Sequence, residues 1–91
     1  MSVRFTARHM EGGSEHKHIA ELKWVEDGAQ KTGVSARAVL VEWIRDKQGS
    51  GYVLDSKGNK AVVKVRDAKP PYVQTIADGK WTDNLLALPT F

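Results

Sequence analysis

The sequence predicts a small α+β protein with one domain, residues 1–91, in which a single helix packs across an antiparallel sheet. The predicted order is β-β-α-β-β-β, followed by a leucine-rich turn at the C-terminal end. Three observations lead to this prediction. The length allows only one hydrophobic core, several segments alternate apolar and polar residues as strands do, and one segment has helical periodicity.

Alternation predicts the first two strands. Apolar side chains take every second position over residues 3–9 and again over residues 18–26. A polar loop at 11–15 separates the two segments, and Asp27-Gly28 ends the second. Together they predict a long antiparallel hairpin.

Residues 35–48 are predicted to form the helix. An apolar residue recurs at i, i+3, i+4, i+7 and i+8, which gives one apolar stripe. The stripe consists of Ala36, Val39, Leu40, Trp43 and Ile44. Ser35 is expected to cap the first free amide groups and Gly49 to end the helix in the left-handed conformation.

The C-terminal half predicts a second hairpin and a further strand. Residues 51–55 and 60–67 flank a turn at 56–59, and apolar residues alternate with basic ones in the second of these strands. The two prolines at 70–71 exclude regular ladder bonding and favour an extended entry into a strand at 72–77.

The end of the chain carries dense turn signals. Asp78-Gly79 favours a tight reversal because both residues tolerate a positive φ. Thr82 or Asp83 is then expected to cap a short helical turn, and the amide of Asn84 to tie the tail to the sheet. These signals predict a tail that belongs to the packed structure.

The same segment resembles the signature of a small bacterial and phage domain family of unknown function, Tyr-x-x-Thr-x-x-Asp-Gly followed by Asp-Asn-Leu-Leu-x-Leu-Pro. The residues that carry the signature are Tyr72, Thr75, Asp78, Gly79, Asp83, Asn84, Leu85, Leu86, Leu88 and Pro89. The segments 40–44 and 51–54 also resemble the family pattern, whereas Ala77 stands where family members often have proline. The resemblance implies a compact domain and no particular catalytic residue, cofactor or partner.

Composition narrows the classes of function. The chain has no cysteine, which excludes a disulfide scaffold, a thiolate zinc site and a cysteine nucleophile. No apolar segment approaches the roughly 20 residues of a membrane span, and residues 1–8 lack the apolar block of a signal peptide, so a cytoplasmic location is expected. The net charge is +3, with its excess at residues 57–69, where five basic residues accompany one acidic residue.

Three histidines raise the question of a metal site. His16 and His18 alternate, so on an extended strand both imidazoles would point to the same side, near His9. The spacing matches no strong zinc signature. We therefore expect surface-exposed histidines, no bound metal and no cofactor.

Basic residues suggest a second kind of site. If the first strand and the strand at 60–67 were neighbours, their outer faces would form one cationic stripe suited to a phosphate backbone. That stripe would consist of Arg4, Arg8, Lys60, Lys64 and Arg66. The alternative is a solvated lysine-rich face that protects the sheet from aggregation.

No set of residues predicts catalysis. Asp78 and Asp83 are explained by a turn and a helix cap, and no nucleophile, base and oxyanion donor can be combined from the motifs. The sequence therefore predicts a non-enzymatic interaction domain whose partner is a protein or a second copy of the chain, through an unpaired strand edge. The alternative is nucleic-acid binding by the basic hairpin; neither a membrane nor a small-molecule substrate is expected.

Overall fold

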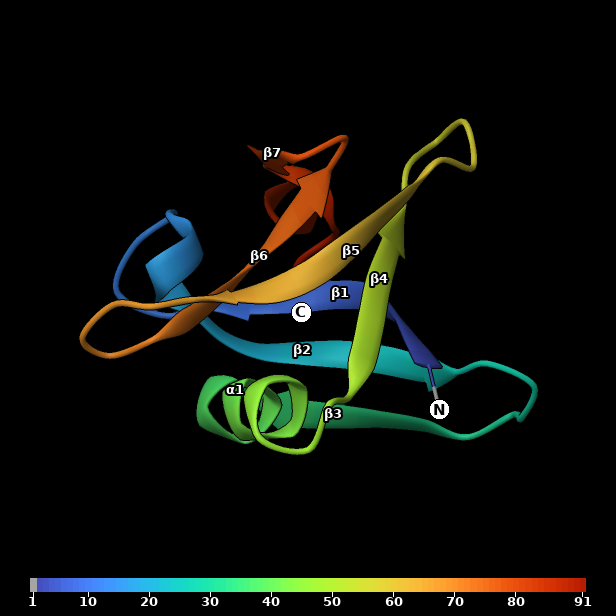
Figure 1. Ribbon diagram of the computed structural model, residues 1–91, viewed down its shortest axis with the longest axis horizontal. Helices are drawn as coiled ribbons and strands as arrows, with labels where there is room; N and C mark the ends of the chain where they lie inside the picture. The colour runs from blue at the N-terminus through green and yellow to red at the C-terminus, as the bar shows by residue number, and fades with distance from the viewer. Residues whose placement is uncertain (1) are drawn as a thin grey trace.

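The computed structural model describes residues 2–91 and contains a seven-stranded sheet, one α-helix and two short 3-10 helices (Figure 1). The elements are β1 (Ser2–Met10), η1 (His16–His18), β2 (Ile19–Glu26), β3 (Thr32–Ala36), α1 (Arg37–Arg45), β4 (Ser50–Leu54), β5 (Lys60–Arg66), β6 (Tyr72–Ala77), β7 (Lys80–Thr82) and η2 (Asn84–Ala87). No helix among these is long and apolar enough to cross a membrane.

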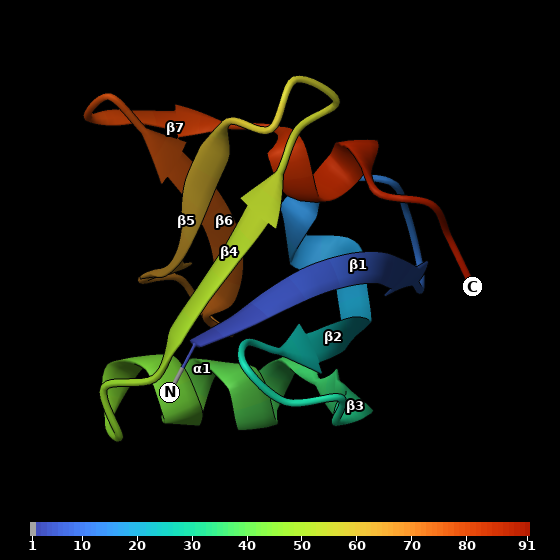
Figure 2. The same ribbon diagram turned by 90° about the vertical axis from the view of Figure 1, so that its right-hand side faces the viewer.

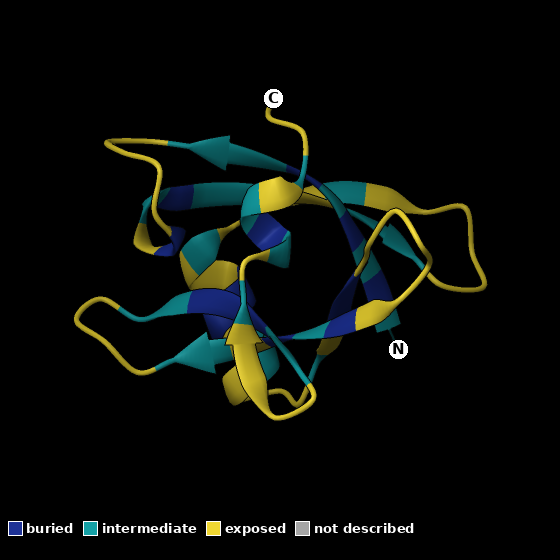
Figure 3. Cartoon of the chain, turned by 90° about the horizontal axis from the view of Figure 1, so that it is seen from above, coloured by how far each residue is buried: buried dark blue, intermediate teal, exposed yellow. Residues whose placement is uncertain are grey.

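The sheet is mixed and strongly curled. Its strand order is β3-β2-β1-β4-β5-β6-β7, with β1 and β4 parallel and every other neighbouring pair antiparallel. Seen from above, the strands wrap around a buried centre (Figure 3). In Figure 2, α1 lies below this centre and η2 above it. The helix and the C-terminal turn therefore cover opposite ends of the curled sheet.

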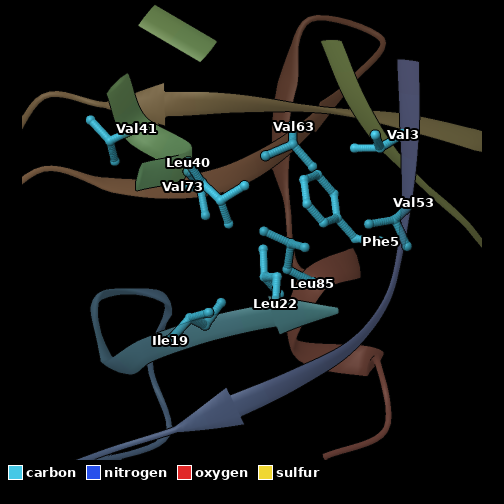
Figure 4. Close-up of a cluster of buried hydrophobic side chains, with 10 residues drawn as sticks. All are labelled: Val3, Phe5, Ile19, Leu22, Leu40, Val41, Val53, Val63, Val73 and Leu85. Atoms are coloured by element: carbon cyan, nitrogen blue, oxygen red, sulfur yellow. The ribbon is translucent and has the colours of Figure 1, made fainter. Parts of the chain in front are cut away.

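The core is built from alternate strand positions together with one side of α1 (Figure 4). Its buried apolar members are Val3, Phe5, Ile19, Leu22, Leu40, Val41, Val53, Val63, Val73 and Leu85. Gly51 on β4 allows the Phe5 ring to approach, since a Cβ atom at this glycine would lie 2.3 Å from the ring. The parallel contact between β1 and β4 thus depends on a position without a side chain.

The C-terminal tail completes the sheet beside β1. The Arg8 backbone N–H donates to the Pro89 carbonyl at 2.9 Å, and the Phe91 N–H donates to the Arg8 carbonyl at 2.9 Å. The Arg8 guanidinium also donates through Nε to the Leu88 carbonyl at 2.9 Å. Within residues 2–91 the Asn84 side chain makes no hydrogen bond, so Arg8, and not Asn84 as expected, ties the tail to the sheet.

The broad fold prediction is confirmed, while two strands and the sheet type differ from it. Both predicted hairpins and the strand at 72–77 form, and the reversal has φ of 53° at Asp78 and 75° at Gly79. The prediction missed β3 and β7, which are short, and it took the sheet to be antiparallel throughout. The parallel β1–β4 pair arises because α1 carries the chain from β3 past β2 and β1 before β4 begins.

The helix is shorter than predicted and its buried side is rotated. It begins at Arg37, and Ser35 lies in β3 and provides no cap. Leu40 and Val41 are buried, whereas Val39, expected in the apolar stripe, is 58% exposed. The reason is that α1 covers one end of a curled sheet and contacts β2, β3, β5 and β6, so the buried arc differs from that of a helix lying across a flat sheet.

The end of the helix also differs from the prediction. The left-handed residue is Gln48, with φ of 56°, and Gly49 has no positive φ. Gly49 instead lies against the Trp43 indole, where a Cβ atom would come within 2.2 Å of the ring. This glycine is required for packing, and the chain reverses at the residue before it.

Truncation of Leu85 tests the role of the C-terminal turn. Leu85 is fully buried in η2, so Leu85→Ala should lower the free energy of unfolding by about 2–5 kcal/mol through lost burial and a residual cavity. Urea denaturation measures this change. Leu54→Ala, at an exposed position, should cost less than about 1 kcal/mol. Equal costs for the two variants would show that η2 is not part of the core.

Candidate binding surfaces

The five predicted cations do not form one stripe. Arg4 and Arg8 lie on β1, whereas the other three lie on β5, and β4 runs between the two strands. The strands are therefore not neighbours, as the stripe required. Arg8 in addition is engaged with the C-terminal tail, which gives it a structural role.

Three of the cations do share a face. Lys60, Lys64 and Arg66 alternate with the buried Ala61 and Val63, so they point away from the core. We call this side of β5, with the facing residues of its neighbours, the basic face. Within residues 2–91 none of the three cations forms an ion pair with a carboxylate.

At one end of the basic face, Lys60 covers Tyr52 of β4. The Lys60 Nζ lies 4.2 Å from the centre of the Tyr52 ring, and the Tyr52 hydroxyl donates to Asp27 Oδ1 at 2.7 Å. This hydrogen bond, together with burial, raises the pKa of Tyr52. Tyr52 is nearly buried and therefore positions Lys60 without offering a free ring.

At the other end, Arg66 lies over Trp81 of β7. The guanidinium carbon is 4.3 Å from the centre of the indole, and Nη1 donates to Gln74 Oε1 at 3.1 Å. Gln74 Nε2 in turn donates to the Thr82 carbonyl at 3.2 Å. Sequence reasoning missed Trp81, although the alternation of Lys80, Trp81 and Thr82 directly after a hairpin turn is the signal that could have found it.

A second surface lies at the opposite end of the strand order, where α1 meets β2 and β3. A cavity of about 230 Å³ opens there, and we call it the edge cavity. Its apolar walls are Val3, Trp24, Val39, Leu40 and Trp43. Its polar residues are Glu26, Lys31, Ser35, Glu42 and Lys47.

The two indoles of the edge cavity are held against glycines. A Cβ atom at Gly33 would lie 2.4 Å from the Trp24 ring, as one at Gly49 would lie too close to Trp43. The Trp24 Nε1–H donates to Ser35 Oγ at 3.0 Å, which fixes that ring over β3. The walls of the cavity are therefore set by backbone positions that exclude any larger residue.

The strand beside this cavity has an open edge. β3 is the last strand of the sheet on this side and pairs only with β2 (Figure 1). The Glu26 N–H donates to the Lys31 carbonyl at 2.9 Å, which makes this a hydrogen-bonded pair. Because such pairs alternate in an antiparallel ladder, Gly33 and Ser35 also direct their backbone groups to β2, and Thr32 and Val34 direct theirs outward.

The three histidines do not converge. His16 and His18 lie on a turn of 3-10 helix and not on an extended strand, so the expected common orientation is wrong. His18 Nδ1 accepts from the Glu15 N–H at 3.1 Å, and His9 Nδ1 lies 2.7 Å from the Phe91 carbonyl. In the part of the chain that the structure describes, no cluster of histidine and acidic side chains could hold a metal ion.

His16 is buried, contrary to its expected exposure. It is 8% exposed, and its Nε2 makes no hydrogen bond within residues 2–91. Asp83 Oδ1 lies 3.9 Å away and belongs to the signature segment. Burial lowers the pKa of His16, and the attraction of Asp83 opposes that shift only in part.

The signature residues take structural positions. Asp78 and Gly79 form the β6–β7 turn, and Asp83 precedes η2 without a side-chain cap bond. Leu85 is buried, with Leu86 and Leu88 packed against the core. Pro89 supplies a carbonyl to Arg8.

The chain belongs to the family described as Protein of unknown function (DUF3892), whose model matches residues 3–89. Neither the search of curated proteins nor the search of solved structures found a match.

The burial of His16 makes the stability of the fold depend on pH. Because its pKa is below the ordinary 6.5 in the folded state, the unfolded chain binds the proton more readily. Stability should therefore fall as the pH drops below 6.5 towards the folded pKa. Urea denaturation between pH 7.5 and 5 should show a smaller acid-side loss for His16→Gln than for the wild type.

His9→Gln is the matched control. The pKa of His9 is raised, chiefly by its hydrogen bond to Phe91, so this group stabilises the fold below pH 6.5 and loses that effect as the pH rises through its folded pKa. Its removal should thus change the pH profile in the opposite direction. Parallel profiles for wild type and His16→Gln would contradict the assignment to His16.

Proposed function

We propose that this domain is a non-enzymatic module that binds an extended protein segment as an added strand on β3, with one apolar side chain of the segment in the edge cavity. The observation that carries the proposal is the position of an apolar cavity directly beside an open strand edge. In strand addition, main-chain hydrogen bonds supply affinity, and pockets for alternate side chains supply specificity.

The backbone of β3 supports this mode of binding. Thr32 and Val34 present free N–H and C=O groups, spaced by two residues as an added strand requires. Ser35 of β3 and Lys31, the residue before this strand, both line the cavity. An added strand therefore places side chains of one face next to Val39 and Trp43 of the helix.

Charge defines the class of segment. No residue of β3 is charged, and the cavity lining holds two carboxylates and two ammonium groups, of which Glu42 and Lys47 pair at 3.7 Å. The surface is thus locally neutral. It suits an uncharged segment rich in β-branched or aromatic residues rather than an acidic or basic one.

Two substitutions test the two halves of the proposal. Val34→Pro removes an N–H from the open edge and leaves the β2–β3 ladder intact. Val39→Asp places a carboxylate at the mouth of the edge cavity, at an exposed position in the first turn of α1 where a negative charge suits the helix dipole. Both variants should fold, which thermal melting checks.

Selection from a phage-displayed random-peptide library provides the ligand for this test. Peptides enriched on the wild type should contain an apolar residue within an uncharged extended stretch, and each substitution should weaken binding about tenfold or more. Val34→Ile, which keeps the edge N–H, is the control and should bind as the wild type does. Failure to enrich any peptide, or equal binding by all variants, would refute the proposal.

Self-association would use the same edge of β3, and sedimentation distinguishes it from binding of a different protein. If sedimentation shows a wild-type dimer that Val34→Pro converts to a monomer, the segment is β3 of a second copy.

A further inference from the structure

The lysines of the basic face lie on an interior strand. Cations that guard a sheet against edge-to-edge aggregation belong on its edge strands. β5 lies between β4 and β6 in the strand order, with Lys60 paired to β4 and with Lys64 and Arg66 paired to β6, so these cations are not on an edge strand of the sheet. Over the seven residues Lys60–Arg66 the strand extends about 20 Å, a length that spans several phosphates of a nucleic-acid strand.

The positive charge of this face is not neutralised by the protein. Asp67 follows Arg66 in the chain, and Asp78 lies in the β6–β7 turn, yet neither is within ion-pair distance of a β5 cation. Lys64 is exposed and stands directly opposite Gln74, a neutral residue. The three cations are thus available to an anionic partner.

Arg66 is held in place before any partner arrives. Its guanidinium is stacked over Trp81 and hydrogen-bonded to Gln74, which is itself anchored on the Thr82 carbonyl. Only one of its nitrogens is used in this network, so the remaining N–H groups can meet a phosphate in a fixed orientation.

Trp81 offers a ring that the core does not use. It is 43% exposed, whereas Trp24 and Trp43 are packed against Gly33 and Gly49. Its row on the sheet continues through Ile76 and Val62, both half-buried on the same outer face. An exposed indole beside an apolar strip and fixed cations is the combination on which unpaired bases stack.

We infer that the basic face binds single-stranded nucleic acid, with phosphates on Lys64 and Arg66 and a base stacked on Trp81. A single strand is favoured over a duplex because its bases are free to leave their own stack and reach the indole. This face also presents no helix to a major groove, since α1 buries Leu40 and Val41 in the core together with Val63 of β5, on the side of the sheet opposite Lys64. In Figure 2, α1 lies below the sheet.

The test uses a fluorescein-labelled oligonucleotide of mixed sequence, alone and annealed to its complement, and measures anisotropy from low to physiological salt. The single strand should bind saturably and more tightly than the duplex. Lys64→Ala should reduce the slope of log Kd against log salt by about 0.7, the value for one phosphate contact on a single strand. Trp81→Ala should weaken binding at least about fivefold at fixed salt, and Trp81→Phe should recover part of the loss.

Lys17→Ala is the matched control. It removes the same charge from an exposed lysine in η1, outside the basic face, and should leave the salt slope unchanged. Val34→Pro and Val39→Asp should also bind the oligonucleotide as the wild type does. The inference and the proposed peptide site are therefore tested independently of each other. Circular dichroism confirms that each variant is folded.

Four results would overturn the inference. They are the absence of binding at low salt, equal losses for Lys17→Ala and Lys64→Ala, tighter binding of the duplex, and unchanged binding by Trp81→Ala. An anionic membrane is the other partner to test, with vesicles that contain phosphatidylglycerol. Binding to these vesicles without binding to the oligonucleotide would assign the basic face to lipid and would also overturn the inference.

Discussion

The structure depends on β1, which pairs with three different parts of the chain. One side of this strand is paired with β2, while the other side is divided between β4 at Ser2–Arg4 and the C-terminal tail at Arg8. A curled sheet of this size leaves part of a long strand unpaired on one side, and buried backbone groups there would be costly. The tail supplies those hydrogen bonds and brings η2 over the core, so the two ends of the chain stabilise each other.

The same curl creates both candidate binding surfaces. Because the sheet wraps around the core, α1 covers only one end, where it contacts β5 and β6 as well as β2 and β3. The space left between the helix and the β2–β3 hairpin is the edge cavity, whose indoles lie flat against Gly33 and Gly49. On the outer side of the sheet, Lys60 and Lys64 of β5 are exposed.

Much of the fold could be predicted because its signals are local. Alternation found β1, β2 and β5, the turn at 56–59 and the prolines at 70–71 placed β4 and β6, and the Asp78-Gly79 reversal followed from backbone preference alone. β3 and β7 were missed because segments of five and three residues carry too few alternating positions. The parallel β1–β4 contact and the tie through Arg8 are long-range pairings, which no local pattern specifies. For the same reason, sequence reasoning assigned Arg8 to the predicted cationic stripe, although its guanidinium and backbone bind the C-terminal tail. The contact between Arg66 and Trp81 was missed for this reason too.

The distribution of charge over the strands separates protection from recognition. A sheet that used lysine only to resist aggregation would carry it on both edges. Of the two edge strands, β7 carries Lys80, whereas β3 has no charged residue over Thr32–Ala36, and two further lysines lie on β5, between β4 and β6. The uncharged edge of β3 is the place where another strand could add, whereas β5 has a neighbouring strand on each side in the strand order. β5 presents exposed cationic side chains, which favour a polyanion as the proposed partner, whereas β3 presents free backbone groups, which favour a peptide. The two candidate surfaces thus differ in the groups that each presents to solvent, backbone N–H and C=O groups on β3 and cationic side chains on β5, and the two partners proposed for them differ accordingly.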